Sequence, residues 1–407
     1  LRYILLTFVE ITMAFMRRLL TILLLGLCLV ACTQHSTYWG TLLDIESYIE
    51  ERPDSALVVL EQIDISQLSN KEEKAKHAVL LSMALDKNFV DKTDFEVLQP
   101  AIDYYEENGS TTDKLRTYYY QGCIYQNMGN KTLAMESFVK AISEGCESND
   151  MLTMARTYFA QGTIYFSLYE WDDYIETNKN AASYFKQAEK YNSYANCLIR
   201  IINGYTLNDD AENALSYINE CKQMLGVISD KRVADFYSAY LIYVTKYGTN
   251  QEIDSFINDY INIITDSFKD WLTLCNAYYK IGKYEEALHA TEQYRSSTNT
   301  RDELKYKALI SMIYEKTGRY EESLRAYKEF MVVSDSTNLA IMRQDTKFVE
   351  ECHNLEMAKA RETEAKNRLT IIVLGCTVAL MASLYIINLI RKRLKKSRVE
   401  NAQLLSE

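Results

Sequence analysis

The chain has 407 residues, of which 48% are hydrophobic and 25% charged, and these proportions argue against bulk disorder. It contains only two prolines, Pro53 and Pro100, and 13 glycines. β-Sandwiches, β-barrels and Rossmann-type folds need proline and glycine in their many turns and loops. A chain with so few of both is therefore predicted to be almost entirely helical. The net charge of −11 argues against a general nucleic-acid binder.

The N-terminal segment has the pattern of an export signal. Arg17 and Arg18 precede an uncharged apolar stretch from Leu19 to Ala31, which is too short to span a bilayer but suits a signal peptide. We expect residues 1–31 to be this signal, with residues 1–15 either not translated or removed. The sequence Leu29-Val30-Ala31-Cys32 resembles a bacterial lipoprotein box, and the resemblance implies acylation of Cys32. An ordinary signal peptide with a chance cysteine is the alternative.

Residues 32–333 contain a repeated pattern. The segment around Gly122 to Ala141 has the residue spacing of a tetratricopeptide repeat, and two others with this spacing lie around Trp271 to Tyr294 and Ser311 to Tyr327. The chain resembles this repeat family, which implies a right-handed superhelical solenoid of helical pairs around one continuous core. Taking the small residue of the first helix as a marker predicts eight pairs, about 38 residues apart, with the markers at positions 44, 83, 122, 162, 202, 239, 275 and 311.

Particular residues explain the spacing. A small marker such as Gly122 lets the first helix of a pair approach its partner closely, and a glycine at 129, 282 or 318 ends that first helix in a left-handed conformation. We expect the pairs marked by positions 44, 83 and 239 to be degenerate.

The C-terminal part is predicted to cross a membrane. Residues 334–368 are polar and charged, and we expect a stalk helix, in which Phe348, Cys352 and Leu355 could form a short dimerisation seam or simply face solvent. Residues 370–390 are 21 uncharged positions, enough for a transmembrane helix, which we expect at 369–390. The tail 391–407 carries six basic residues, which favours a cytoplasmic C-terminus and a periplasmic repeat array at the inner membrane.

The charge divides along the chain in agreement with this topology. Residues 1–31 carry a net +2 and residues 391–407 a net +4, which leaves −17 for residues 32–390. The basic tail is predicted to contact anionic lipid, and no nucleic-acid partner is expected for this chain.

No catalytic motif is present in the sequence. It lacks the glycine-rich nucleotide loops, the G-x-S-x-G nucleophile elbow and H-E-x-x-H, and its four histidines, 35, 77, 289 and 353, have no ligand spacing. We therefore expect a non-enzymatic protein without a cofactor or a metal ion.

With no catalytic or metal-binding motif in the sequence, we expect the functional part of the chain to be a binding surface. Solenoids of this family bind peptides or partner helices along the concave face formed by the first helices of the pairs, so the resemblance implies a groove. Projecting that geometry onto this sequence predicts a basic and aromatic lining that suits a carboxylate-bearing or extended peptide. The predicted groove residues are Arg116, Tyr119, Arg156, Phe159, Arg200, Asn203, Asn276, Tyr279, Lys305 and Lys316.

The layout as a whole resembles bacterial membrane-anchored signalling and regulatory proteins with an exported repeat array and one membrane span. This resemblance implies a scaffold or sensor in signal transduction that binds a periplasmic peptide or protein. Two alternatives remain open. One is a glycan-binding lipoprotein of nutrient uptake, and the other is the sensor half of a transmembrane transcription regulator whose DNA-binding domain is absent from this chain.

Overall fold

The structure is a computed structural model that describes residues 35–297, 303–332, 334, 367–368, 370–375, 377 and 390. Residues 1–336 and 337–407 form two separate units. The described residues contain helices and turns but no β-strand. The prediction of an all-helical chain is confirmed over this part.

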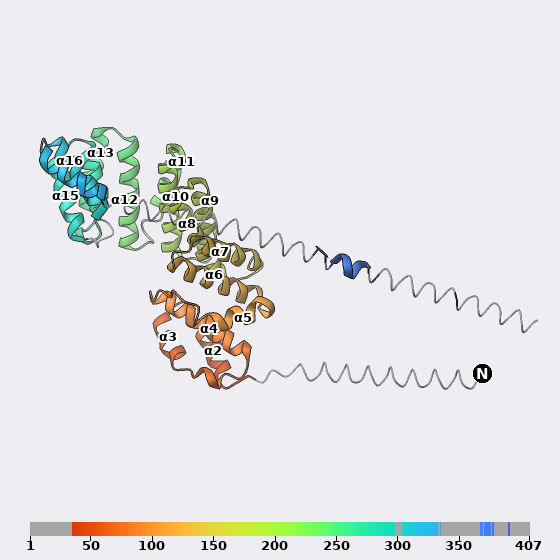
Figure 1. Ribbon diagram of the computed structural model, residues 1–407. Helices are drawn as coiled ribbons and strands as arrows, with labels where there is room; N and C mark the ends of the chain where they lie inside the picture. The colour runs from red at the N-terminus through yellow and green to blue at the C-terminus, as the bar shows by residue number, and fades with distance from the viewer. Residues whose placement is uncertain are drawn as a thin grey trace, which may run out of the picture. The chain divides into compact units, whose positions relative to one another are not determined.

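The helices of the first unit follow one another as pairs (Figure 1). The first helix of each pair, helix A, is in turn α2 (Tyr38–Tyr48), α4 (Lys71–Lys87), α6 (Thr111–Asn127), α8 (Met151–Ser167), α10 (Tyr191–Leu207), α12 (Asp230–Tyr247), α14 (Trp271–Lys280) and α16 (Glu303–Lys316). The second helix, helix B, is α3 (Pro53–Glu61), α5 (Gln99–Asn108), α7 (Lys131–Glu144), α9 (Trp171–Gln187), α11 (Ala211–Lys222), α13 (Asn250–Ile263), α15 (Tyr284–Ser297) and the helical residues 320–332. Two short 3-10 helices, η1 (Ile65–Gln67) and η2 (Asp266–Phe268), lie in the connections.

Contacts between neighbouring helices give the array its order. Helices A and B of a pair contact each other, and helix B contacts helix A of the next pair, as in α6, α7 and α8. Successive A helices also touch, for example α4 with α6 and α10 with α12. The eight marker positions all lie on A helices, so the predicted degenerate pairs are present as α2–α3, α4–α5 and α12–α13.

The repeat is longer than the predicted average in the first part of the array. Helices α4, α6, α8 and α10 begin at residues 71, 111, 151 and 191, every 40 residues, and each has 17 residues. The additional length therefore resides at least partly in long A helices.

Several A helices end in the same left-handed backbone conformation. Gly129, Gly282 and Gly318 have φ values of 78°, 80° and 76°, which confirms the predicted left-handed positions. Tyr169 and Asp209 adopt φ of 61° and 60° at the equivalent place, 40 and 80 residues after Gly129. A side chain can occupy this position at a cost of about 1 kcal/mol, which explains why glycine alone did not identify every helix end.

Close approach of the paired helices depends on small residues. A Cβ atom at Gly122 would lie 2.3 Å from Cε1 of Phe138 on α7, and one at Gly162 would lie 2.7 Å from Nδ2 of Asn178 on α9. The marker at Asp44 is wrong as a packing position, because Asp44 is exposed and Leu42 and Ile45 fill the core instead.

The core is not one uninterrupted cluster as predicted. Three large clusters follow each other along the array, and Tyr237 packs against both the second and the third. This arrangement follows from repeat architecture, because each pair packs mainly on its neighbours.

Most predictions for the two chain ends fall outside the described residues. This applies to the signal at 1–31, to Cys32, to the tail at 391–407 and to nearly all of the stalk at 334–368. Of residues 369–390, only 370–375, 377 and 390 are described, and they are helical. No helix within the described part is both long and apolar enough to cross a membrane.

Candidate binding surface

The predicted groove residues lie on five A helices. Residues 116 and 119 are on α6, 156 and 159 on α8, 200 and 203 on α10, 276 and 279 on α14, and 305 and 316 on α16. Their surroundings differ strongly along the array, so the surface is best described from its N-terminal end.

Arg116 is surrounded by carboxylates of the chain itself. Its Nε donates to Oδ2 of Asp150 at 2.6 Å, and its Nη1 donates to Glu46 on α2. Lys76 on α4 also contacts Glu46, with 2.6 Å between Nζ and Oε2. Burial would raise the pKa of Glu46, but the hydrogen bonds and charges of Lys76 and Arg116 outweigh it and lower this pKa.

Arg156 makes a two-pronged ion pair across the array. Its Nη1 and Nη2 donate to the two carboxylate oxygens of Glu50, each at 2.7 Å. Lys87 donates to the same carboxylate at 2.7 Å. Burial works against ionisation of Glu50, yet the bonds and charges of Arg156 and Lys87 lower its pKa to about 2.

Arg156 is the main partner of Glu50. Burial and the neighbouring charge of Arg156 lower the pKa of Lys87, despite its bond to Glu50. For Arg156 the bonds and charge of Glu50 outweigh burial, and its pKa is raised. A fork-shaped guanidinium matches two carboxylate oxygens better than an ammonium does.

These contacts change the predicted character of the N-terminal half of the groove. Arg116 and Arg156 lie on helices A as expected, but carboxylates from the first pair and from Asp150 neutralise them. A basic lining free for an acidic ligand is therefore not present at these two positions. We call the set Glu46, Glu50, Lys76, Lys87, Arg116, Asp150 and Arg156 the ion-pair network.

Tyr119 is a core residue instead of a groove residue. It is 7% exposed, and its ring lies 4.9 Å from that of Tyr120 and 6.2 Å from that of Phe138. The prediction that it faces a ligand is therefore wrong.

Arg200 has a different environment, made of neutral groups. Its guanidinium stacks on Phe159, with 3.9 Å from Cζ to the ring centroid. Its Nη1 donates to the Phe159 carbonyl at 3.1 Å, its Nη2 to Thr163 Oγ1 at 3.0 Å, and its Nε to the Tyr174 hydroxyl at 3.2 Å. Within the described residues no carboxylate pairs with Arg200, so its charge is not compensated by an ion pair.

Asn203 lies one turn further along α10. Its side-chain Oδ1 is buried and has no hydrogen-bond partner within the described part of the chain. Arg200 thus offers a cation without an ion pair, stacked on the Phe159 ring, and Asn203 three residues later on α10 has an unsatisfied polar atom. We call these three residues the Arg200 site.

The C-terminal predicted residues form no comparable cluster. Asn276 is exposed and donates to the Leu272 carbonyl at 2.9 Å, which is a local contact within α14. Tyr279 packs against Tyr284 with 5.7 Å between ring centroids. Lys305 and Lys316 are exposed on α16.

Two cavities were not found from the sequence. The first has a volume of about 420 Å³ and is lined by Tyr240, Tyr243 and Tyr247 of α12 together with residues of α11 and α13. The second, of about 440 Å³, is lined by Trp271 and Tyr278 of α14, by residues of α13 and α15, and by Lys269 in the connection between α13 and α14. The spacing of the three tyrosines on one helix face is a signal that could have indicated the first cavity.

Comparison with known proteins agrees with the helical-pair architecture. Residues 115–144 and 304–331 match the family model of the tetratricopeptide repeat. The first segment lies on α6 and α7, and the second on α16 and the following helix. No match was found among curated proteins.

Several solved structures are similar in fold at low sequence identity. The apo form of RapI is 14% identical, with a TM-score of 0.53 over 77% of this chain and 92% of RapI. A Rap protein complexed with Competence and Sporulation Factor is 16% identical, with a TM-score of 0.50 over 79% of this chain and 97% of the Rap chain. A tetratricopeptide repeat protein from Parabacteroides merdae ATCC 43184 is 12% identical and covers 64% of this chain and 93% of its own, with a TM-score of 0.49. The chain therefore contains tetratricopeptide repeats within a longer array of helical pairs.

Proposed function

We propose that this protein is a non-enzymatic scaffold or sensor that binds a peptide or protein partner through its helical repeats. The observation that carries the proposal is the charge of Arg200, which has no ion-pair partner among the described residues and stacks on Phe159. Arginine has five N–H donors, and the three hydrogen bonds that Arg200 makes leave two of them for a ligand.

The chemistry of the Arg200 site favours a carboxylate or a backbone carbonyl of an extended peptide. A guanidinium that is already stacked and hydrogen-bonded loses little freedom when it binds an anionic group. The similar fold of a Rap protein that was solved with Competence and Sporulation Factor supports the idea that such an array can hold a partner.

Site-specific photo-crosslinking in cells tests this proposal. A photoreactive residue placed at Phe159 should capture a partner, and the additional change Arg200→Gln should strongly reduce that capture. The matched control carries the photoreactive residue at Glu212, an exposed position on α11. Equal capture from both positions, or capture that does not depend on Arg200, would contradict the proposal.

We further propose that the repeats are exported and held at the inner membrane, with a role in signal transduction. The support is the order of the sequence features: a basic and apolar segment ending at Cys32, an uncharged stretch over 370–390 and six basic residues directly after it. Fatty-acid labelling that is lost in Cys32→Ser and recovery of the chain in the inner-membrane fraction are the expected results. Recovery in the outer membrane would exclude this topology.

A further inference from the structure

The second cavity lies away from the Arg200 site. It is bounded by Ile261 of α13, by Lys269 in the connection before α14, by Trp271 and Tyr278 of α14, and by residues of α15, among them Glu285, Glu286 and His289. We call it the Trp271 pocket. Its volume of about 440 Å³ is in the range of pockets that bind small molecules or side chains of a partner.

Aromatic rings form one wall of the Trp271 pocket. Trp271 and Tyr278 are half-buried, and the ring of His289 meets that of Trp271 edge-on, with 6.3 Å between centroids and 88° between planes. The indole already faces one cation, because Nζ of Lys269 lies 5.7 Å from its centroid. This wall is therefore suited to the aliphatic stem and the charged head of a basic side chain.

The first turn of α15 adds negative charge to the lining of the pocket. Glu285 and Glu286 are exposed in the first turn of α15, and neither forms an ion pair within the described residues. The nearby Lys283 is already paired with Asp254 at 2.6 Å. Lys269 is likewise paired with Asp266 at 2.6 Å, and its side chain is only 9% exposed.

The position of these carboxylates at a helix start has a simpler explanation, since the helix dipole favours acidic residues there. Glu212 in the first turn of α11 has the same local position. The difference is that Glu285 and Glu286 line a cavity with aromatic walls, and Glu212 lines neither of the two large cavities. Lys269 is already paired with Asp266, whereas Glu285 and Glu286 have no ion-pair partner among the described residues, so a cationic ligand would complement their charge.

We propose that the Trp271 pocket binds the positively charged side chain of a lysine or arginine in a partner peptide. The rings of Trp271 and Tyr278 pack against the side chain, and Glu285 and Glu286 pair with its charge. This site goes beyond the Arg200 site and does not depend on it. The overall excess of 56 acidic over 45 basic residues favours the approach of such a ligand.

Tryptophan fluorescence can test the pocket directly, because the chain has only three tryptophans. Replacing Trp39 and Trp171 by phenylalanine in the full-length chain leaves Trp271 as the only reporter. The probe is a short capped peptide of arginines, compared with a glutamine peptide of equal length and with an uncharged disaccharide. We expect saturable quenching by the arginine peptide alone, which weakens as salt is added.

Variants separate the pocket from other acidic surfaces. The double change Glu285→Gln and Glu286→Gln should weaken binding of the arginine peptide by about fivefold or more at low salt. Glu212→Gln is the matched control and should leave the affinity unchanged, and circular dichroism verifies that each variant is folded. Arg200→Gln should also bind the arginine peptide normally, so failure of the Arg200 site and failure of this pocket can be told apart.

Four results would overturn the proposal. Equal binding of the arginine and glutamine peptides would show that charge is not recognised. Quenching by the disaccharide alone would indicate a carbohydrate site. No change with any probe, or an unchanged affinity in the Glu285→Gln, Glu286→Gln variant, would exclude the pocket as a cation site.

Discussion

Replacing Glu50 by glutamine should destabilise the N-terminal repeats and remove a specific pH dependence. The carboxylate accepts two hydrogen bonds from Arg156 and one from Lys87, all at 2.7 Å. Its pKa falls from 4.5 to about 2 in the folded chain, which corresponds to about 3 kcal/mol of stabilisation of the ionised form. Because the side chain of Glu50 is 27% exposed, we expect Glu50→Gln to cost about 2 kcal/mol at neutral pH.

The sign of the pH dependence follows from the lowered pKa. The contribution of Glu50 is fully present above pH 4.5 and is lost as the pH falls from 4.5 towards 2. The stability difference between the original chain and Glu50→Gln should therefore shrink across this interval. Urea unfolding followed by circular dichroism at several pH values measures it, and Lys87→Gln should cost less than Arg156→Gln because Arg156 provides the two-pronged pair. A difference that is the same at pH 3 and pH 7 would refute the reasoning.

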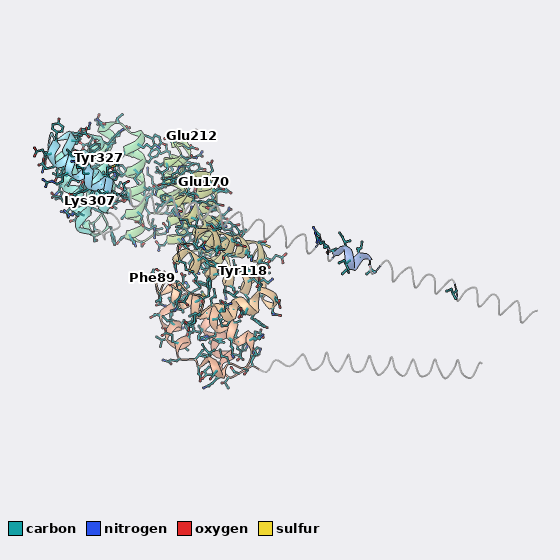
Figure 2. The ribbon with its side chains drawn as sticks, in the orientation of Figure 1. Phe89, Tyr118, Glu170, Glu212, Lys307 and Tyr327 are labelled. Atoms are coloured by element: carbon teal, nitrogen blue, oxygen red, sulfur yellow. The ribbon has the colours of Figure 1, made fainter. Side chains whose placement is uncertain are left out.

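Three further changes test the packing and the helix ends. Gly122→Ala should lower the free energy of unfolding by about 1–3 kcal/mol, because the new methyl group would meet Phe138. The control is Gly40→Ala on α2, where the methyl group meets open space. In the same thermal unfolding assay this control should be neutral or stabilising. Phe89, labelled in Figure 2, has φ of 59° and is 93% exposed, so Phe89→Gly should raise the urea midpoint by the equivalent of about 1 kcal/mol. An unchanged or lower midpoint would contradict this expectation. Ser110→Ala removes the hydrogen-bonding side chain of the capping box at the start of α6 and should cost about 1 kcal/mol, measured by urea unfolding, and no loss would show that the cap is replaceable.

The helical pairs could be predicted because their determinants are local in the sequence. Gly122 marks a crossing and Gly129 marks a helix end, and both effects need only the residues of one pair. The ends at Tyr169 and Asp209 were harder to find, since these side chains adopt a glycine-like backbone conformation. In each case the amide one residue later donates to a tyrosine carbonyl, as Glu170 does to Tyr165 at 3.1 Å and Asp210 to Tyr205 at 2.9 Å.

The surface was predicted less well than the pairs. Two residues three positions apart on a helix differ by about 60° in direction, so Arg116 can pair with Glu46 and Asp150 while Tyr119 packs in the core. The pairing of Glu50 with Arg156 joins residues that are 106 positions apart, and no local pattern indicates which carboxylate meets which cation. Sequence periodicity identified the cations, and only the folded chain shows which of them are already neutralised.

The ion-pair network also changes how the array should respond to a ligand. In a solenoid each repeat usually contacts only its neighbours, so stability is nearly a sum of local terms. The Glu50–Arg156 pair instead connects the first pair of helices to the fourth, and Arg116 joins the first pair to the third. The first four helical pairs should therefore unfold together as one cooperative unit. Arg200 lies on the fifth pair, where no carboxylate within the described residues holds it, and this boundary between neutralised and unpaired cations is where we expect a partner to bind.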